Sequence, residues 1–122
     1  MTATDDTRAQ VQLAALAAIG AGAEELVALD VSGQLPFADA FLIMSGRSER
    51  NVSAIADAVE DKLGEAGTRV KRREGAAEGR WALIDFGDTV VHVFHPEERD
   101  YYSLERLWKD CPVIPLEEAL AR

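Results

Sequence analysis

The sequence predicts one α/β domain built on a mixed five-stranded sheet with flanking helices. Stretches with helical periodicity alternate with short runs rich in β-forming residues, and a two-residue Gly-Asp turn joins two of those runs. The 122 residues leave no room for a second independent core, and 48% of them are hydrophobic, which is enough for one core. We expect residues 1–122 to form a single domain, with a flexible tail at 1–6 and a C-terminal tail at 113–122.

Three stretches have the spacing of helices. Residues 7–21 are rich in alanine, with Asp5, Asp6 and Thr7 supplying capping oxygens and favourable charge at the start. Residues 97–109 carry aromatic and leucine side chains on one side. The clearest helix follows Ser48, its expected N-cap, with an apolar stripe formed by Val52, Ile55, Ala56, Val59 and Leu63.

Five strands are expected between and after these helices. The run 40–44 is continuously apolar, which is typical of a strand buried on both faces. The run 68–74 carries four basic residues and suits an exposed edge. The five expected strands are 25–31, 40–44, 68–74, 80–86 and 89–95.

The Gly87-Asp88 turn sets the register of the last two strands. Phe86 should oppose Thr89, and Trp81 should oppose Phe94. One face is then almost wholly apolar and should lie under helices. The other face mixes aromatic, aliphatic and titratable groups, as protein interfaces do; alternatively, helices cover both faces and Trp81 is ordinary core. That second face carries Trp81, Leu83, Asp85, Val90, His92 and Phe94.

The charge balance favours a basic protein over nucleic acid as a binding partner. The net charge is −9, from 22 acidic and 13 basic residues, whereas proteins that hold nucleic acid through phosphates need a basic surface. An acidic chain suits a basic protein partner, although acidity also simply favours solubility. No apolar run reaches bilayer length, the N-terminus lacks the positive charge of a signal peptide, and Cys111 is the single cysteine. We expect a cytoplasmic, non-enzymatic binding protein.

Several residues suggest chemistry but fit structural roles better. His92 and His95 are three apart on a strand and point to opposite faces, so we expect no metal site. Asp85 and His92 could pair diagonally, yet no nucleophile accompanies them. The Ser45–Ser48 turn could hold a phosphate, or it could be a tight strand-to-helix turn. The basic cluster at 69–73 could touch RNA, or it could be a charged edge strand. No catalytic residue and no cofactor is predicted.

Four segments of the chain, taken in order, match the pattern of one family: LDVSG at 29–33, DAFLIMSGRSERNVSAIAD at 39–57, EGAAEGRWALIDFGDTVVHVF at 74–94 and RDYYSLERLWKDCP at 99–112. Together they resemble the ribosomal silencing factor family, whose plant relative is Iojap. This resemblance implies a fold similar to the nucleotidyltransferases, without known catalysis. It also implies binding to the large ribosomal subunit through ribosomal protein fourteen, a steric block to subunit joining that lowers translation, and homodimers.

The resemblance also implies which residues contact the ribosome. These are Trp81, Phe86 and Asp88, with Asp85 and Tyr102 as weaker candidates. Phe86 stands where family members often have another large apolar residue. Because the hairpin register points Trp81 and Phe86 to opposite faces, a partner must grip the hairpin tip to reach both; otherwise one of them is core. A nucleotidyltransferase-like enzyme and a direct RNA-binding protein remain as alternatives.

Overall fold

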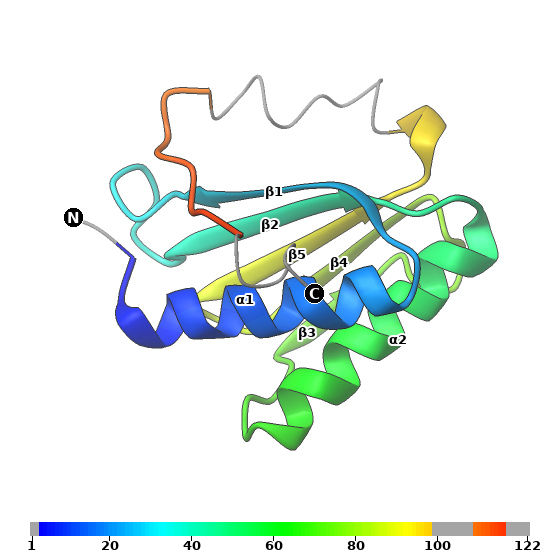
Figure 1. Ribbon diagram of the computed structural model, residues 1–122, viewed down its shortest axis with the longest axis horizontal. Helices are drawn as coiled ribbons and strands as arrows, with labels where there is room; N and C mark the ends of the chain where they lie inside the picture. Colours follow the sequence, from blue (N-terminus) through cyan, green and yellow to red (C-terminus); the bar gives the residue numbers. More distant parts are fainter. Residues whose placement is uncertain (1–2, 99–108, 117–122) are drawn as a thin grey trace.

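The computed structural model describes residues 3–98 and 109–116, and it contains the five expected strands (Figure 1). The described residues also form two long helices, and residues 96–98 are helical. The remainder of the expected helix 97–109 lies outside the described ranges, apart from Lys109. The elements are α1 (Asp5–Gly20), β1 (Glu24–Asp30), β2 (Ala40–Ser45), α2 (Glu49–Glu65), β3 (Arg72–Glu74), β4 (Trp81–Asp85) and β5 (Thr89–Phe94).

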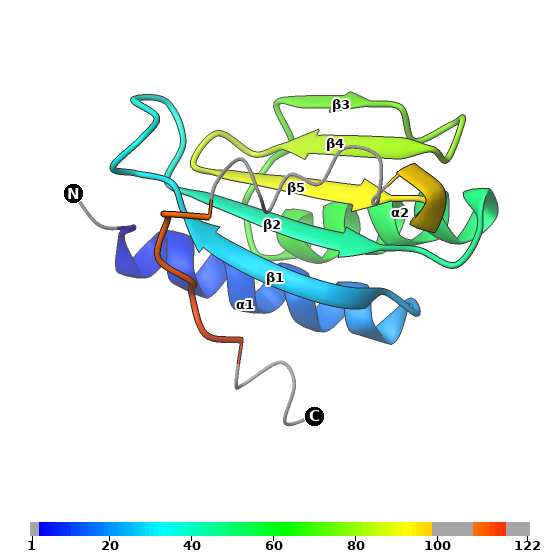
Figure 2. The same ribbon diagram turned by 90° about the horizontal axis from the view of Figure 1, so that it is seen from above.

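The strands form one sheet in the order β1-β2-β5-β4-β3 (Figure 2). β2 and β5 are parallel and the other neighbours are antiparallel, so the predicted mixed five-stranded sheet is confirmed. The hairpin register is also confirmed, with Trp81 opposite Phe94 and Leu83 opposite His92. Both α1 and α2 pack on the same face of the sheet (Figure 2).

The main core lies between the helices and the sheet. The apolar stripe of α2 is fully buried there, and α1 contributes mostly small side chains. The sheet supplies the face that the hairpin register predicted to lie under helices. Its buried members include Leu42, Met44, Ala82, Ile84, Val91 and Val93.

The predicted starts of the first helix and of the third strand are wrong. α1 begins at Asp5 rather than at residue 7, because Thr4 is the N-cap and accepts a hydrogen bond from the Thr7 N–H. The expected tail at 1–6 therefore already includes the cap and the first two residues of the helix. β3 covers only Arg72–Glu74 rather than 68–74, although it is the edge strand as expected.

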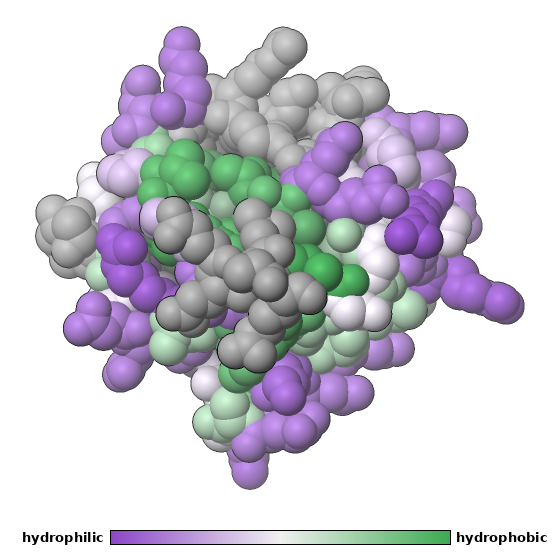
Figure 3. Space-filling view, viewed as in Figure 1, coloured by the Kyte–Doolittle hydropathy of each residue, from purple (hydrophilic) through white to green (hydrophobic). Residues whose placement is uncertain are grey.

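The segment 112–114 lies along the free edge of β1 rather than forming a loose tail. Val113 forms a bridge to Leu29, and the Ile114 N–H donates to the Ala28 carbonyl at 2.8 Å. Ile114 and Leu116 are buried in the main core. Val113 is 64% exposed, and apolar side chains gather over β1 and this segment on the face seen in Figure 3. The expected tail at 113–122 is thus packed structure over its first four residues.

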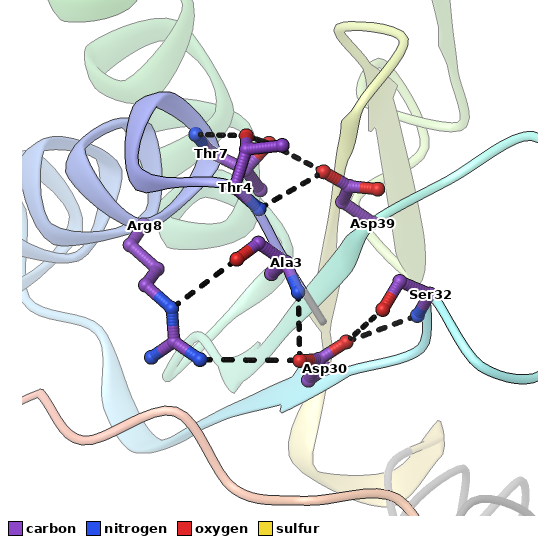
Figure 4. A network of polar contacts seen from close by, with 7 residues as sticks. All are labelled: Ala3, Thr4, Thr7, Arg8, Asp30, Ser32 and Asp39. Carbon is purple, nitrogen blue, oxygen red and sulfur yellow. Dashed lines mark hydrogen bonds and ion pairs between the residues drawn. The ribbon is translucent and has the colours of Figure 1, made fainter. Parts of the chain in front are cut away.

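A buried carboxylate ties the N-terminus to the end of β1 (Figure 4). Asp30 is 3% exposed and accepts hydrogen bonds from the Ala3 N–H at 2.8 Å and from the Ser32 hydroxyl at 2.6 Å. Nη2 of Arg8 lies 3.9 Å from Oδ2 of Asp30. Burial by itself would raise the pKa of Asp30, but the hydrogen bonds from Ser32 and Ala3 and the charge of Arg8 together lower it below its ordinary value. The ionised form is therefore the one that holds the N-terminal segment.

Replacing Asp30 with alanine is expected to lower the free energy of unfolding by about 2 kcal/mol, because it leaves buried N–H groups without an acceptor. The matched control is Asp39→Ala. Asp39 accepts from the Thr4 N–H at 3.3 Å and the Thr7 hydroxyl at 3.0 Å, at a less buried position, so its loss should cost about 1 kcal/mol or less. Urea unfolding of both variants measures the difference. Equal losses would contradict the special role of Asp30.

Candidate functional site

Side chains from neighbouring strands line up on the sheet face opposite α1 and α2, which we call the docking face. Residues that are direct partners in the strand register share a face. Three rows cross the sheet in this way. They are Phe41–Val90–Asp85–Arg72, Ile43–His92–Leu83–Glu74, and Phe94–Trp81.

The docking face has an apolar centre and a charged border along β3. Leu29, Ile43, Val90 and Phe94 are buried in a second apolar cluster, which Cys111 joins from the chain end. Phe41, Trp81 and Leu83 pack against this cluster while keeping part of their surface exposed. Aromatic side chains that are partly exposed and packed on a rigid apolar support are suited to anchor a protein interface.

Trp81 is half-buried, and its contacts include Phe94 and His92. Its indole ring stacks on Phe94, with ring centroids 5.0 Å apart and an interplanar angle of 24°. Its Nε1–H donates a hydrogen bond to Nδ1 of His92 at 3.2 Å. The position predicted for an interface aromatic therefore holds an indole with a fixed orientation.

His92 is 5% exposed, and its ring packs edge-on against Phe41 at a centroid distance of 4.9 Å. Burial lowers the pKa of His92 to about 4, so the ring is neutral at physiological pH. Its Nε2 has no hydrogen-bond partner among the described residues. The Asp85 carboxylate instead accepts from the Gly87 N–H at 2.8 Å and closes the hairpin turn. The two side chains therefore have different partners, and the possible Asp85–His92 dyad is not formed.

A hollow of about 320 Å³ adjoins His92 on the docking face. Phe37, which is 72% exposed, projects from the loop before β2 and forms part of its wall. The hollow leaves no signal in the sequence, because Phe37 lies in an irregular loop and the pairing of β3 with β4 depends on contacts between distant segments. The remaining lining residues are Phe41, Lys71, Arg72, Leu83, Asp85, Gly87, Val90 and His92.

The structure separates the residues predicted to contact a partner. Trp81 and Asp85 lie on the docking face, and Asp88 is exposed at the hairpin tip. Phe86 is 5% exposed and belongs to the core beneath the helices, which disfavours it as a contact residue. Of Trp81 and Phe86, Phe86 is the one that serves as core. Tyr102 lies outside the described residues.

The basic cluster does not form one cationic surface. Arg73 is paired with Asp57 at 2.6 Å and with Glu60, both on α2. Arg72 lies 3.8 Å from Glu74. Lys71 and Arg72 line the hollow, and Arg69 is exposed. The charged edge-strand interpretation fits this arrangement better than an RNA-binding stripe.

The Ser45–Ser48 segment is a tight turn between β2 and α2. The Gly46 N–H donates to the Phe94 carbonyl, and the Arg47 N–H donates to Oδ1 of Asn51, both at 2.8 Å. A Cβ at Gly46 would lie 2.7 Å from Val52, so glycine is needed for the close approach. Ser48 caps α2 as predicted. Because these N–H groups already have partners, the turn interpretation is favoured over a phosphate site.

Within residues 3–98 and 109–116, no group of three or more His, Cys, Asp or Glu side chains is placed to hold a metal ion. Within the same ranges, neither helix has the length and apolar character needed to cross a membrane.

Comparison with known proteins places the chain in a family. The model of the family "Ribosomal silencing factor during starvation" (RsfS) matches residues 4–122. The ribosomal silencing factor of Bacillus subtilis is 48% identical over 107 residues, which are 88% of this chain and 91% of that protein. The chloroplastic protein Iojap of Zea mays is 33% identical over 76 residues, covering 62% of this chain and 33% of that protein. A crystal structure from Bacillus halodurans superposes with a TM-score of 0.79 at 46% identity, covering 89% of this chain and 99% of that one. This chain therefore belongs to the ribosomal silencing factor family.

Proposed function

We propose that this protein represses translation by binding the large ribosomal subunit through ribosomal protein fourteen and sterically blocking the joining of the small subunit. The observation that carries the proposal is the family match over residues 4–122. The bacterial relative is itself named a ribosomal silencing factor. A mouse relative is named for the assembly of the mitochondrial ribosomal large subunit, which points to the same subunit.

The docking face suits such a role. Trp81 offers a half-buried indole on a rigid apolar support, and truncating anchors of this kind removes much of an interface's affinity. Asp88 is exposed at the hairpin tip, and the net charge of −9 favours the approach to a basic ribosomal protein. Trp81 and Asp88 lie at opposite ends of the hairpin, roughly 20 Å apart at about 3.3 Å per residue. A standard interface of about 800 Å² per partner can span that distance.

The mechanism needs no bond chemistry, and we propose that the protein is not an enzyme. A rigid domain fixed where the small subunit must land is sufficient to prevent joining. A nucleotidyltransferase would need carboxylates that hold a metal ion near the turn after β2. In this chain the strand after α2 presents Arg72 and Arg73 instead. Direct RNA binding is disfavoured because Arg73 is neutralised by α2.

We further propose that the protein acts in the cytoplasm, where ribosomal subunits join, and that it forms a homodimer when it is free. The homodimer rests on the family resemblance. Whether the dimer and the ribosome use the same surface decides whether binding to subunits must first dissociate the dimer.

Sedimentation with separated ribosomal subunits tests the proposal. The protein is expected to travel with large subunits, to be sparse with small subunits and assembled ribosomes, and to sediment as a dimer when no subunit is present. Purified ribosomal protein fourteen without RNA should also retain it, which separates protein docking from RNA binding. Equal distribution between the two subunits would refute the proposed function.

A further inference from the structure

Trp81 and His92 lie diagonally across the antiparallel pair β4–β5. Trp81 faces Phe94 and Leu83 faces His92, so the indole reaches the imidazole from the neighbouring register position. The indole Nε1–H donates to Nδ1 of His92 at 3.2 Å while the ring stacks on Phe94 at 5.0 Å. This hydrogen bond and this ring stack therefore both act on the orientation of Trp81.

The hydrogen bond from the indole determines the tautomer of His92. An indole N–H can only donate, so Nδ1 must present its lone pair. The neutral imidazole then carries its proton on Nε2. The ring is 5% exposed and packs edge-on against Phe41 and alongside Phe94, so the surrounding rings hold it in place. His92 is thus a fixed hydrogen-bond acceptor beneath a half-buried tryptophan.

The unpaired nitrogen makes a purely packing role for His92 unfavourable. Nε2 is buried and has no partner within the described part of the chain, and an unsatisfied buried donor destabilises the fold. A leucine or phenylalanine would fill this apolar position without that penalty. What a hydrocarbon side chain cannot provide is the acceptor at Nδ1.

We infer that His92 is a positioning residue for docking, because its Nδ1 lone pair fixes the Trp81 indole in the orientation that the partner contacts. The inference rests on the proposed function and adds a residue that itself need not touch the partner. An anchor that is ordered before binding loses less side-chain entropy in the complex, which raises affinity. His92 therefore acts through Trp81.

Replacing His92 with either of two amide residues distinguishes the role of the Nδ1 acceptor from the role of the ring in packing. In His92→Asn the amide oxygen can occupy the Nδ1 position, whereas in His92→Gln the amide lies one bond farther out. Both residues are neutral and polar. Affinity for purified large subunits should fall about threefold to tenfold in His92→Gln and stay within about twofold in His92→Asn. Thermal unfolding of both variants reports whether the fold is intact.

The indole N–H resonance of Trp81 gives a readout on the free protein. The chain has two tryptophans, so a Trp81→Phe variant assigns the signal. The resonance should keep its hydrogen-bonded position and slow exchange in His92→Asn, and should shift and exchange faster in His92→Gln. Loss of this signal in a folded His92→Asn variant would overturn the inference, and that result stands even if His92→Gln fails to fold.

A double-mutant cycle tests whether His92 acts through the indole N–H. In the Trp81→Phe background, adding His92→Gln should weaken binding no further. A His92→Gln protein that binds like the unaltered chain, or that loses as much affinity in the Trp81→Phe background, would overturn the inference. If the unaltered chain does not bind large subunits, the proposed function fails, and the role in docking fails with it. In that case the indole resonance still decides separately whether His92 orients Trp81.

Discussion

Trp81→Ala is expected to weaken binding to ribosomal protein fourteen by about thirtyfold or more, which corresponds to about 2 kcal/mol or more. The substitution removes the largest partly exposed aromatic group on the docking face, together with its stack on Phe94. Because Trp81 is only half-buried, the free energy of unfolding should fall by less than the roughly 3–5 kcal/mol that is usual for a core tryptophan. Titration calorimetry and urea unfolding on the same samples measure the two effects.

Asp88→Lys is the companion variant, because it changes charge without disturbing packing. The Asp88 side chain is exposed, and it is the backbone carbonyl that accepts from the Asp39 and Ala40 N–H groups. Stability should therefore be unchanged, while affinity for a basic partner should fall and its salt dependence should weaken. A Trp81→Ala protein that melts far below the unaltered chain, beside an Asp88→Lys protein that binds normally, would place the interface elsewhere.

The hairpin was predictable because its determinants are local. The Gly87-Asp88 turn fixes which residues oppose each other, and the alternation of side chains then assigns Trp81 to one face and Phe86 to the other. The same reasoning left open which of the two is core, since a sequence does not show where the helices pack. The position of α1 and α2 on the Phe86 side resolves this question.

The features that escaped prediction depend on contacts between distant segments. Asp30 meets the Ala3 N–H across 27 residues, and Ile114 docks on β1, so neither leaves a periodic signal. The hollow beside His92 depends on the position of the Phe37 loop and on the pairing of β3 with β4. The His92–Trp81 hydrogen bond was accessible in principle, since the register placed both residues diagonally on one face. Asp85 is also diagonal to His92 on that face, and the sequence does not show which of the two partners His92 takes.

The stability of the protein should fall between about pH 6.5 and pH 4 because of His92. Burial lowers the pKa of His92 in the folded chain to about 4, whereas an unfolded chain binds this proton near pH 6.5. On acidification the unfolded state is therefore protonated first, and the folded state loses relative stability until it also takes up the proton at about pH 4. A difference of about 2.5 pH units at 1.36 kcal/mol each gives a loss of about 3 kcal/mol. Above pH 6.5 this contribution is fully present.

The His92→Asn variant isolates this effect, because asparagine does not titrate. Urea unfolding at intervals from pH 7.5 to pH 4 should give a free energy that declines by up to about 1.4 kcal/mol per pH unit more steeply for the unaltered chain than for the variant. Asp30 affects stability in a separate, lower pH range. Because the pKa of Asp30 is lowered in the folded chain, the stabilisation by its carboxylate is lost only as the pH falls below 3.8, the ordinary pKa of aspartate. Parallel pH profiles for the two proteins would show that His92 is not held neutral in the folded chain. That result would also remove the fixed acceptor that the orientation of Trp81 requires.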